Sequence, residues 1–247
     1  MLNVLEIARE VANDVGIRGL SSLVSNTEPH AQALLTQINQ SGNNLAMKRN
    51  AFSQGWSALT REVVFETVPE QDEYPFPEDF NFLVNGTLWD RSEYQPSYGP
   101  LTPKEWQLTK SGLVGNTSIY YNYRIRGTST GPGRSLFLDP TPGPGEIRTL
   151  VYEYVSWNWL ASSDNQTFRR RVREDLDTPL FDEQLMIMDL NWRFREARGL
   201  SYAPQLAQFE MLRDEYFGRD TGSRDIKLSP DHISPFYANI PETGFGQ

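Results

Sequence analysis

The residues best suited to chemistry lie in one charged stretch, where Glu174, Asp175 and Asp177 follow a run of basic side chains: Arg169, Arg170, Arg171 and Arg173. Two of these carboxylates could act as the acid and the base, or the nucleophile, of a hydrolase. Alternating charges at this spacing also pair with one another or with a neighbouring subunit. We interpret the stretch as a salt-bridged linker between a sheet and a helix.

Two further groups of side chains could bind a ligand. Acidic residues within 70–79 surround Tyr74-Pro-Phe-Pro77, but the Asp-x-Asp-x-Asp-Gly spacing of a calcium loop is missing, so we expect an exposed connection. Trp157 and Trp159 point to the same face of a predicted strand and could stack on a sugar. Interface aromatics or core filling explain these two side chains equally well.

The sequence lacks the residues that most other kinds of catalytic or metal-binding site require. The chain has no cysteine, which excludes disulfides, thiolate metal sites and a cysteine nucleophile. The two histidines, His30 and His232, cannot build a histidine-rich metal centre, and we expect both at the surface. Gly131-Pro-Gly-Arg-Ser135 lacks the lysine and the helix of a phosphate loop, and no G-x-S-x-G elbow occurs. We predict no catalytic residue, no cofactor and no metal.

Net charge and the length of the apolar runs limit which kinds of partner the chain can bind. Of 247 residues, 23 are basic and 32 are acidic, which gives a net charge of −9. An acidic chain is a poor general nucleic-acid binder, but it suits a wall that DNA slides past without sticking. The apolar runs are far too short to span a bilayer, and the charged N-terminus does not read as a signal peptide. We expect no membrane contact, and synthesis in the cytoplasm.

Two amphipathic helices are predicted within residues 1–60. The first spans about residues 4–15 and stops at Gly16, and the second begins near Pro29 and extends past Gly42. Each has one apolar face, so each must pack against another element.

Two more helices are predicted near the other end of the chain. Residues 180–198 carry two adjacent apolar stripes, which indicates a central helix that ends at Gly199. Pro204 opens the next helix, and Gly218 is its expected stop. The pair should form an antiparallel hairpin.

The middle of the chain has strand character. In residues 118–126, Tyr121 and Tyr123 share one face while Arg124 and Arg126 share the other, a period of two typical of an antiparallel strand. Further strands are expected at residues 63–67, 80–84, 134–139 and 146–155, and a short helix at Pro103. The sum is a five- or six-stranded sheet or a small sandwich.

We therefore predict an α+β fold with an inserted β-rich domain. Residues 1–60 and 165–218 should form a helical bundle, and residues 61–164 the antiparallel β-rich insert. Residues 219–247 should form an extended C-terminal arm.

The arm holds too few apolar residues for a core of its own, but too many for an inert tail. It could lie on its own domain, or it could become ordered on a neighbouring molecule. On the second interpretation, its candidate partner-binding residues are Ile226, Leu228, Ile233, Phe236, Tyr237, Ile240 and Phe245.

Three stretches occur in a distinctive order. They are residues 56–80, starting at Trp-Ser-Ala-Leu-Thr-Arg-Glu; residues 136–156, starting at Leu-Phe-Leu-Asp-Pro; and residues 181–202, starting at Phe-Asp-Glu-Gln-Leu. Together they resemble the head-to-tail adaptor proteins of short-tailed bacteriophages, of the tail-accessory or tail tubular protein A type. The resemblance covers residues 1–218.

The resemblance implies a structural virion protein without agreed catalytic residues. Such adaptors form a twelve-fold ring beneath the portal protein, with a helical bundle that anchors the ring and a β-rich part that meets the tail nozzle or tail tube protein. Extended termini reach the portal or adjacent subunits, and the genome passes through the lumen without specific binding. Twelve copies would carry a charge of −108 (12 × −9), which would keep DNA mobile.

Two alternatives stay open from the residues alone. A carbohydrate-binding or peptidoglycan-hydrolysing tail protein would use Glu174 or Glu153 near Trp157 or Trp159, and some relatives carry a reported cell-wall hydrolase activity. A soluble α+β domain of another role is the second alternative.

Overall fold

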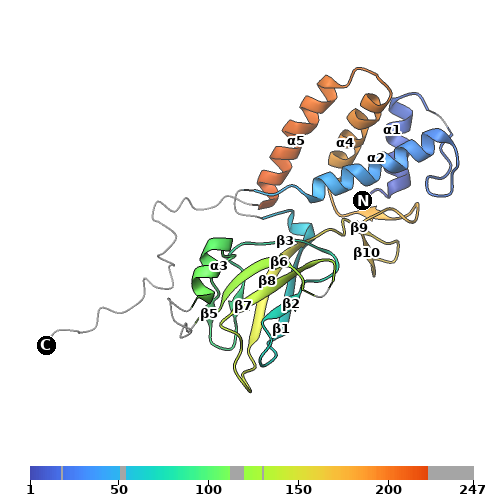
Figure 1. Cartoon of the computed structure of the whole chain (residues 1–247). Coiled ribbons are helices and arrows are strands. Elements are labelled where there is room, and N and C mark those ends of the chain that lie inside the picture. Colours follow the sequence, from blue (N-terminus) through green and yellow to red (C-terminus); the bar gives the residue numbers. More distant parts are fainter. Residues whose placement is uncertain (18, 51–53, 112–119, 130, 222–247) are drawn as a thin grey trace.

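The computed structural model describes residues 1–17, 19–50, 54–111, 120–129 and 131–221. Its helices are α1 (Val4–Asp14), α2 (Pro29–Ala46), α3 (Pro103–Lys110), α4 (Glu183–Ala197) and α5 (Ala203–Thr221). All the helices except α3 gather at one end of the molecule, and the larger β-sheets lie at the other end (Figure 1). The fold class is α+β with antiparallel sheets, as the sequence predicted.

Helix α4 packs against α1, α2 and α5. Its two apolar stripes explain this position, because one helix can touch several neighbours only if much of its circumference is apolar. The apolar side chains that it buries are Leu185, Met186, Leu190, Trp192 and Phe194. The helical part thus has one shared core, which also takes in Trp56, Val155 and Trp159 from the neighbouring segments.

Local signals set most helix ends. Asn3 caps α1 through a capping box with Glu6, and Pro29 occupies the first turn of α2. Gly199, with φ of +67°, separates α4 from α5. Gly218 does not end α5, which continues to Thr221, so residues 219–221 are helical and not part of an arm.

The β-rich part consists of two layers. One sheet contains β1 (Thr60–Glu66), β8 (Thr149–Ser156), β4 (Trp89–Asp90) and β5 (Gln95–Pro96) in that order, with β3 (Phe80–Leu83) also paired to β8. The other sheet contains β2 (Glu73–Pro75), β7 (Arg134–Asp139) and β6 (Asn122–Gly127). A second core lies between the layers and is rich in tyrosine and leucine.

Strand β6 shows the predicted alternation. Tyr121 and Tyr123 are buried in the second core, whereas Arg124 and Arg126 lie on the outer face, where the Arg126 guanidinium covers the Phe137 ring at 3.7 Å. The first residues of the expected strand, 118 and 119, lie outside the described part of the chain.

A small third sheet joins the two ends of the molecule. It is formed by β9 (Leu160–Ala161), β10 (Phe168–Arg169) and β11 (Thr178–Pro179), with β9 in the middle. We assigned residues 165–218 to the helical part, but residues 168–179 contain these strands, and α4 begins only at Glu183. The turns and Pro179 in this stretch prevent an earlier helical start.

Candidate interaction surfaces

The predicted partner-binding residues all lie beyond Thr221, outside the described residues. These are Ile226, Leu228, Ile233, Phe236, Tyr237, Ile240 and Phe245. The structure nevertheless fixes the point from which this segment leaves the body, because α5 is described to its last turn.

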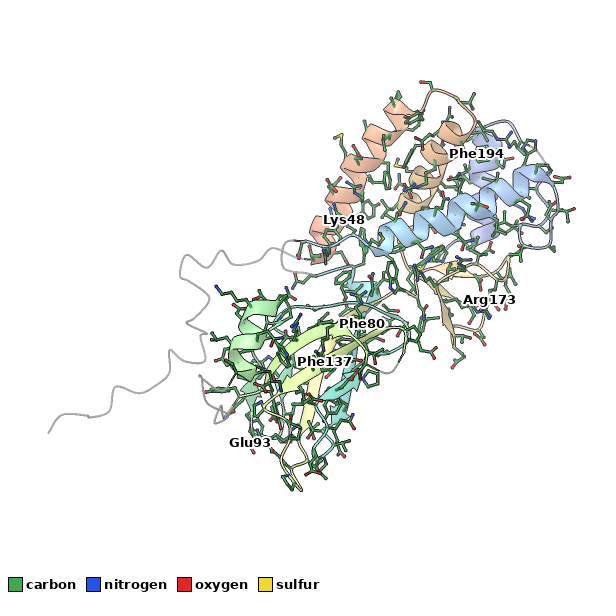
Figure 2. All side chains as sticks on the ribbon, viewed as in Figure 1. Lys48, Phe80, Glu93, Phe137, Arg173 and Phe194 are labelled. Atoms are coloured by element: carbon green, nitrogen blue, oxygen red, sulfur yellow. The ribbon has the colours of Figure 1, made fainter. Side chains whose placement is uncertain are left out.

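The end of α5 is attached to the segment that leads into β1. The Asp220 carboxylate accepts hydrogen bonds from the Ser57 amide at 2.6 Å and the Ser57 hydroxyl at 2.5 Å. Phe217 packs edge-on against Trp56, with ring centroids 4.9 Å apart. Lys48, labelled in Figure 2 near this end of α5, pairs with Asp214 at 2.9 Å. The C-terminal segment therefore starts at the junction of the helical and β-rich parts.

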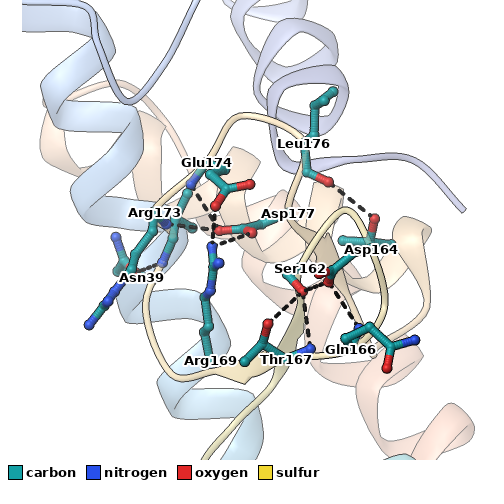
Figure 3. Close-up of polar contacts among 12 residues, drawn as sticks. Asn39, Ser162, Asp164, Gln166, Thr167, Arg169, Arg173, Glu174, Leu176 and Asp177 are labelled. Carbon is teal, nitrogen blue, oxygen red and sulfur yellow. Dashed lines mark hydrogen bonds and ion pairs between the residues drawn. The ribbon is translucent and has the colours of Figure 1, made fainter.

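The charged stretch forms the junction drawn in Figure 3. Arg169 Nη1 lies 2.9 Å from a carboxylate oxygen of Glu174 and 3.1 Å from one of Asp177. Asp177 is fully buried, and its second oxygen accepts the amides of Arg173 at 2.8 Å and Glu174 at 3.0 Å. The hydrogen bond that Arg169 donates to the Glu174 carboxylate contributes most to raising the pKa of Arg169. The predicted salt bridges are thus observed, but the stretch connects β10 to β11 within the small sheet and is not a linker between a sheet and a helix.

The same stretch holds the N-terminal segments in place. The Val4 amide donates to the Asp177 carbonyl at 2.9 Å, at the start of α1. The Asp175 carboxylate accepts the amides of Leu23 at 3.1 Å and Val24 at 2.8 Å. These two carboxylates are engaged in structure, which leaves no acid and base pair poised for hydrolysis among them.

The two tryptophans have different environments. Trp159 is completely buried and packs against Gly42, so it is core and not a sugar platform. Trp157 is partly buried, and the Arg170 guanidinium lies 4.1 Å from its ring centre. Glu153 is exposed on β8 opposite Glu62 of β1, and the two acids line one surface pocket, in which Glu62 forms an ion pair with Arg91.

The acidic segment 70–79 is bound internally. Glu73 accepts hydrogen bonds from the Ser129 hydroxyl and amide and from the Thr128 hydroxyl, which lower the pKa of Glu73 to about 2. Asp79 accepts the hydroxyls of Tyr154 at 2.9 Å and Ser156 at 2.6 Å. The described residues contain no group of three or more acidic, histidine or cysteine side chains that could hold a metal ion.

His30 is exposed and contacts Arg198, whereas His232 lies outside the described residues. No helix in the described segments has both the length and the apolarity needed to cross a bilayer.

Sequence reasoning missed an apolar tip at the end of the β-rich part remote from the helices. Val68, Tyr94 and Ile147 belong to three different connections, and their exposed fractions are 49%, 87% and 62%. The Arg91 amide donates to Thr149 and the Thr67 amide donates to Arg148, which brings these connections together. No sequence signal marks this tip, because single exposed apolar side chains are normal and only their convergence in the fold is informative.

Comparison with known proteins decides the family. The SU10 adaptor protein family matches residues 2–232, which is nearly the whole chain. The chain belongs to the SU10 adaptor protein family. Searching the curated proteins gave no match.

The match to the adaptor family confirms the resemblance that the three sequence stretches indicated. It identifies a structural adaptor protein of a bacteriophage. The match continues past the end of α5 at Thr221 and therefore takes in Ile226 and Leu228 of the predicted arm, but not Phe236 and the residues after it.

Proposed function

We propose that this adaptor is the repeating subunit of a ring that joins the portal protein to the tail of the virion and lets the genome pass. The observation that carries the proposal is the family match over residues 2–232. Twelve copies per ring follow from the resemblance to head-to-tail adaptors. The net charge of −9 per chain supports passage of DNA without binding, because an acidic lumen repels phosphate.

The two ends of the molecule have separate proposed roles. The helical part faces the portal, and the exposed apolar tip formed by Val68, Tyr94 and Ile147 meets the tail nozzle or tail tube protein. Aromatic and aliphatic side chains that converge from separate loops are the usual centre of a protein interface.

Electron microscopy of the full chain mixed with its portal protein tests this function. We expect a closed ring on one end of the portal, with the helical parts next to the portal and the β-rich tips pointing away. A portal that stays bare at saturating adaptor concentration would rule out the connector role. The reverse orientation would preserve the ring but refute the assignment of the two ends.

The arm gives a second prediction. Deleting residues 226–247 removes all seven candidate partner-binding residues, and we expect it to weaken binding to the portal or to neighbouring copies. The body should still melt cooperatively, because both cores lie within the described residues. Co-sedimentation with the portal measures binding, and circular dichroism measures melting. Unchanged assembly would show that the arm has no binding role.

A further inference from the structure

The β-sandwich is open along one flank. Among the described residues, β1 pairs only with β8 and β2 pairs only with β7, so each is the edge strand of its sheet. A groove of about 360 Å³ lies between these two edges. Its apolar lining includes Val63, Phe65, Tyr74, Phe76, Leu136 and Tyr152.

Strand β1 has the alternation of an edge that accepts another strand. Val63 and Phe65 face the groove and are only partly buried, although they pack against the second core. Glu62, Val64 and Glu66 alternate with these two residues and are exposed, and Glu66 also borders the groove at the end of the strand. An unpaired edge with apolar pockets beside it is the geometry by which a sheet binds an extended peptide.

The C-terminal segment contains a short sequence with the matching pattern. In Arg-Asp-Ile-Lys-Leu, residues 224–228, Ile226 and Leu228 are two residues apart and would share one face of an extended strand. Lys227 would then face the other way, toward the side of β1 that carries Glu66. Within the described part of the chain, Glu66 makes no ion pair, so the charges are complementary.

The starting point of this segment favours the groove of another copy. Asp220 is bonded to Ser57, three residues before β1 begins at Thr60. From there, residues 224–228 could follow their own β1 only in the same direction, whereas every strand pair in this sheet is antiparallel. A segment from a neighbouring copy can approach from the far end and pair antiparallel, which is the more stable arrangement.

The reach is sufficient. Leu228 lies seven residues beyond Thr221, which corresponds to about 23 Å of extended chain. A layer of four strands is about 19 Å wide. A copy packed side by side therefore presents its β1 edge within the span of this segment.

We propose that residues 224–228 of one adaptor add as a strand to the β1 edge of the adjacent adaptor, with Ile226 and Leu228 in its groove. The inference rests on the proposed ring, because it requires neighbouring copies. Each copy gives its segment to one neighbour and receives one from the other, which is the head-to-tail contact that closes a ring.

The absence of natural cysteine makes disulfide trapping a direct test. One full-length chain carries Phe65→Cys and a second carries Ile226→Cys, and the two are mixed, assembled with the portal protein and oxidised. We expect a covalent dimer of the two chains that disappears on reduction. Val64→Cys is the matched control, since this neighbouring residue faces away from the groove and should give no such product. The pair Val63→Cys and Leu228→Cys, which belongs to the same antiparallel register, serves as a second test should Phe65→Cys fail to fold.

Three outcomes count against the proposal in different ways. If mass photometry detects assembly but no covalent dimer forms, strand addition is overturned while the connector function is left intact. A third sample is a single chain that carries both cysteines. A crosslink that forms only within that chain would show that the segment fills its own groove, and would also overturn the proposal. Failure of any assembly with the portal would refute the proposed function, and this inference with it.

Discussion

Gly42→Ala should destabilise the protein by about 2–3 kcal/mol, because a well-packed interior does not accept an added methyl group. A Cβ atom at this position would lie 2.1 Å from Cε2 of Trp159, far inside van der Waals contact. Trp159 is fully buried and stacks with Phe181 at a centroid distance of 6.3 Å, so its ring has no free direction in which to move. The stability lost through the clash with Trp159 exceeds the gain of about 1 kcal/mol that alanine brings through its higher helix propensity than glycine.

Gly218→Ala is the matched control for this substitution. Gly218 also lies within a helix, α5, but nothing comes within 4 Å of a Cβ atom added there. Alanine should therefore stabilise the protein by about 0.5–1 kcal/mol through helix propensity alone. Urea unfolding of both variants measures the two effects. Equal changes at the two positions would disprove the close contact between α2 and Trp159.

Asp177→Ala should destabilise the protein by about 3 kcal/mol. The substitution breaks a pair with Arg169 in which the acid is fully buried. It also leaves the amides of Arg173 and Glu174 without their acceptor, and such unsatisfied groups cost about 1–3 kcal/mol each when buried. Because the Asp177 carbonyl receives the Val4 amide, we expect α1 to loosen first.

Glu174→Ala tests whether burial causes this difference. Glu174 pairs with the same arginine at 2.9 Å, but its side chain is 48% exposed, so its loss should cost less than about 1 kcal/mol. Chemical denaturation gives both values, and hydrogen exchange of α1 locates the effect. A loss at position 174 as large as that at position 177 would contradict the account of the junction.

Periodic patterns within single elements were sufficient to predict much of the fold. The strand at Arg134–Asp139 was predicted with its observed bounds, since its neighbouring turns are rich in glycine and proline. Helix α2 continues past Gly42 to Ala46, because the apolar pattern outweighs one glycine. Each of these features depends on residues close in the sequence.

Contacts between distant residues could not be predicted in this way. Asp220 extends α5 beyond Gly218 by bonding to Ser57, which is 163 residues earlier in the chain. The three strands of the small sheet are two residues each and are held by pairing rather than by pattern. The groove beside β1 depends on which strand lies at an edge, and alternation alone does not specify that.

The pairing of charges had a local cause and was predicted correctly. Arg169, Glu174 and Asp177 lie within nine residues of one another, so a single turn of chain can bring them together. The sequence did not indicate that Asp177 is buried while Glu174 is exposed. Burial of Asp177 depends on tertiary packing, in which the Asp177 carbonyl also accepts the Val4 amide at the start of α1.

Mass photometry of the full chain with its portal protein tests most directly whether the adaptor acts by assembling with copies of itself on a partner. We predict a new species heavier than the portal by a ring of adaptors, which for twelve copies of 28.3 kDa is about 340 kDa (12 × 28.3 kDa). A portal peak that keeps its mass at every adaptor concentration, beside a single peak of free chain, would contradict this account.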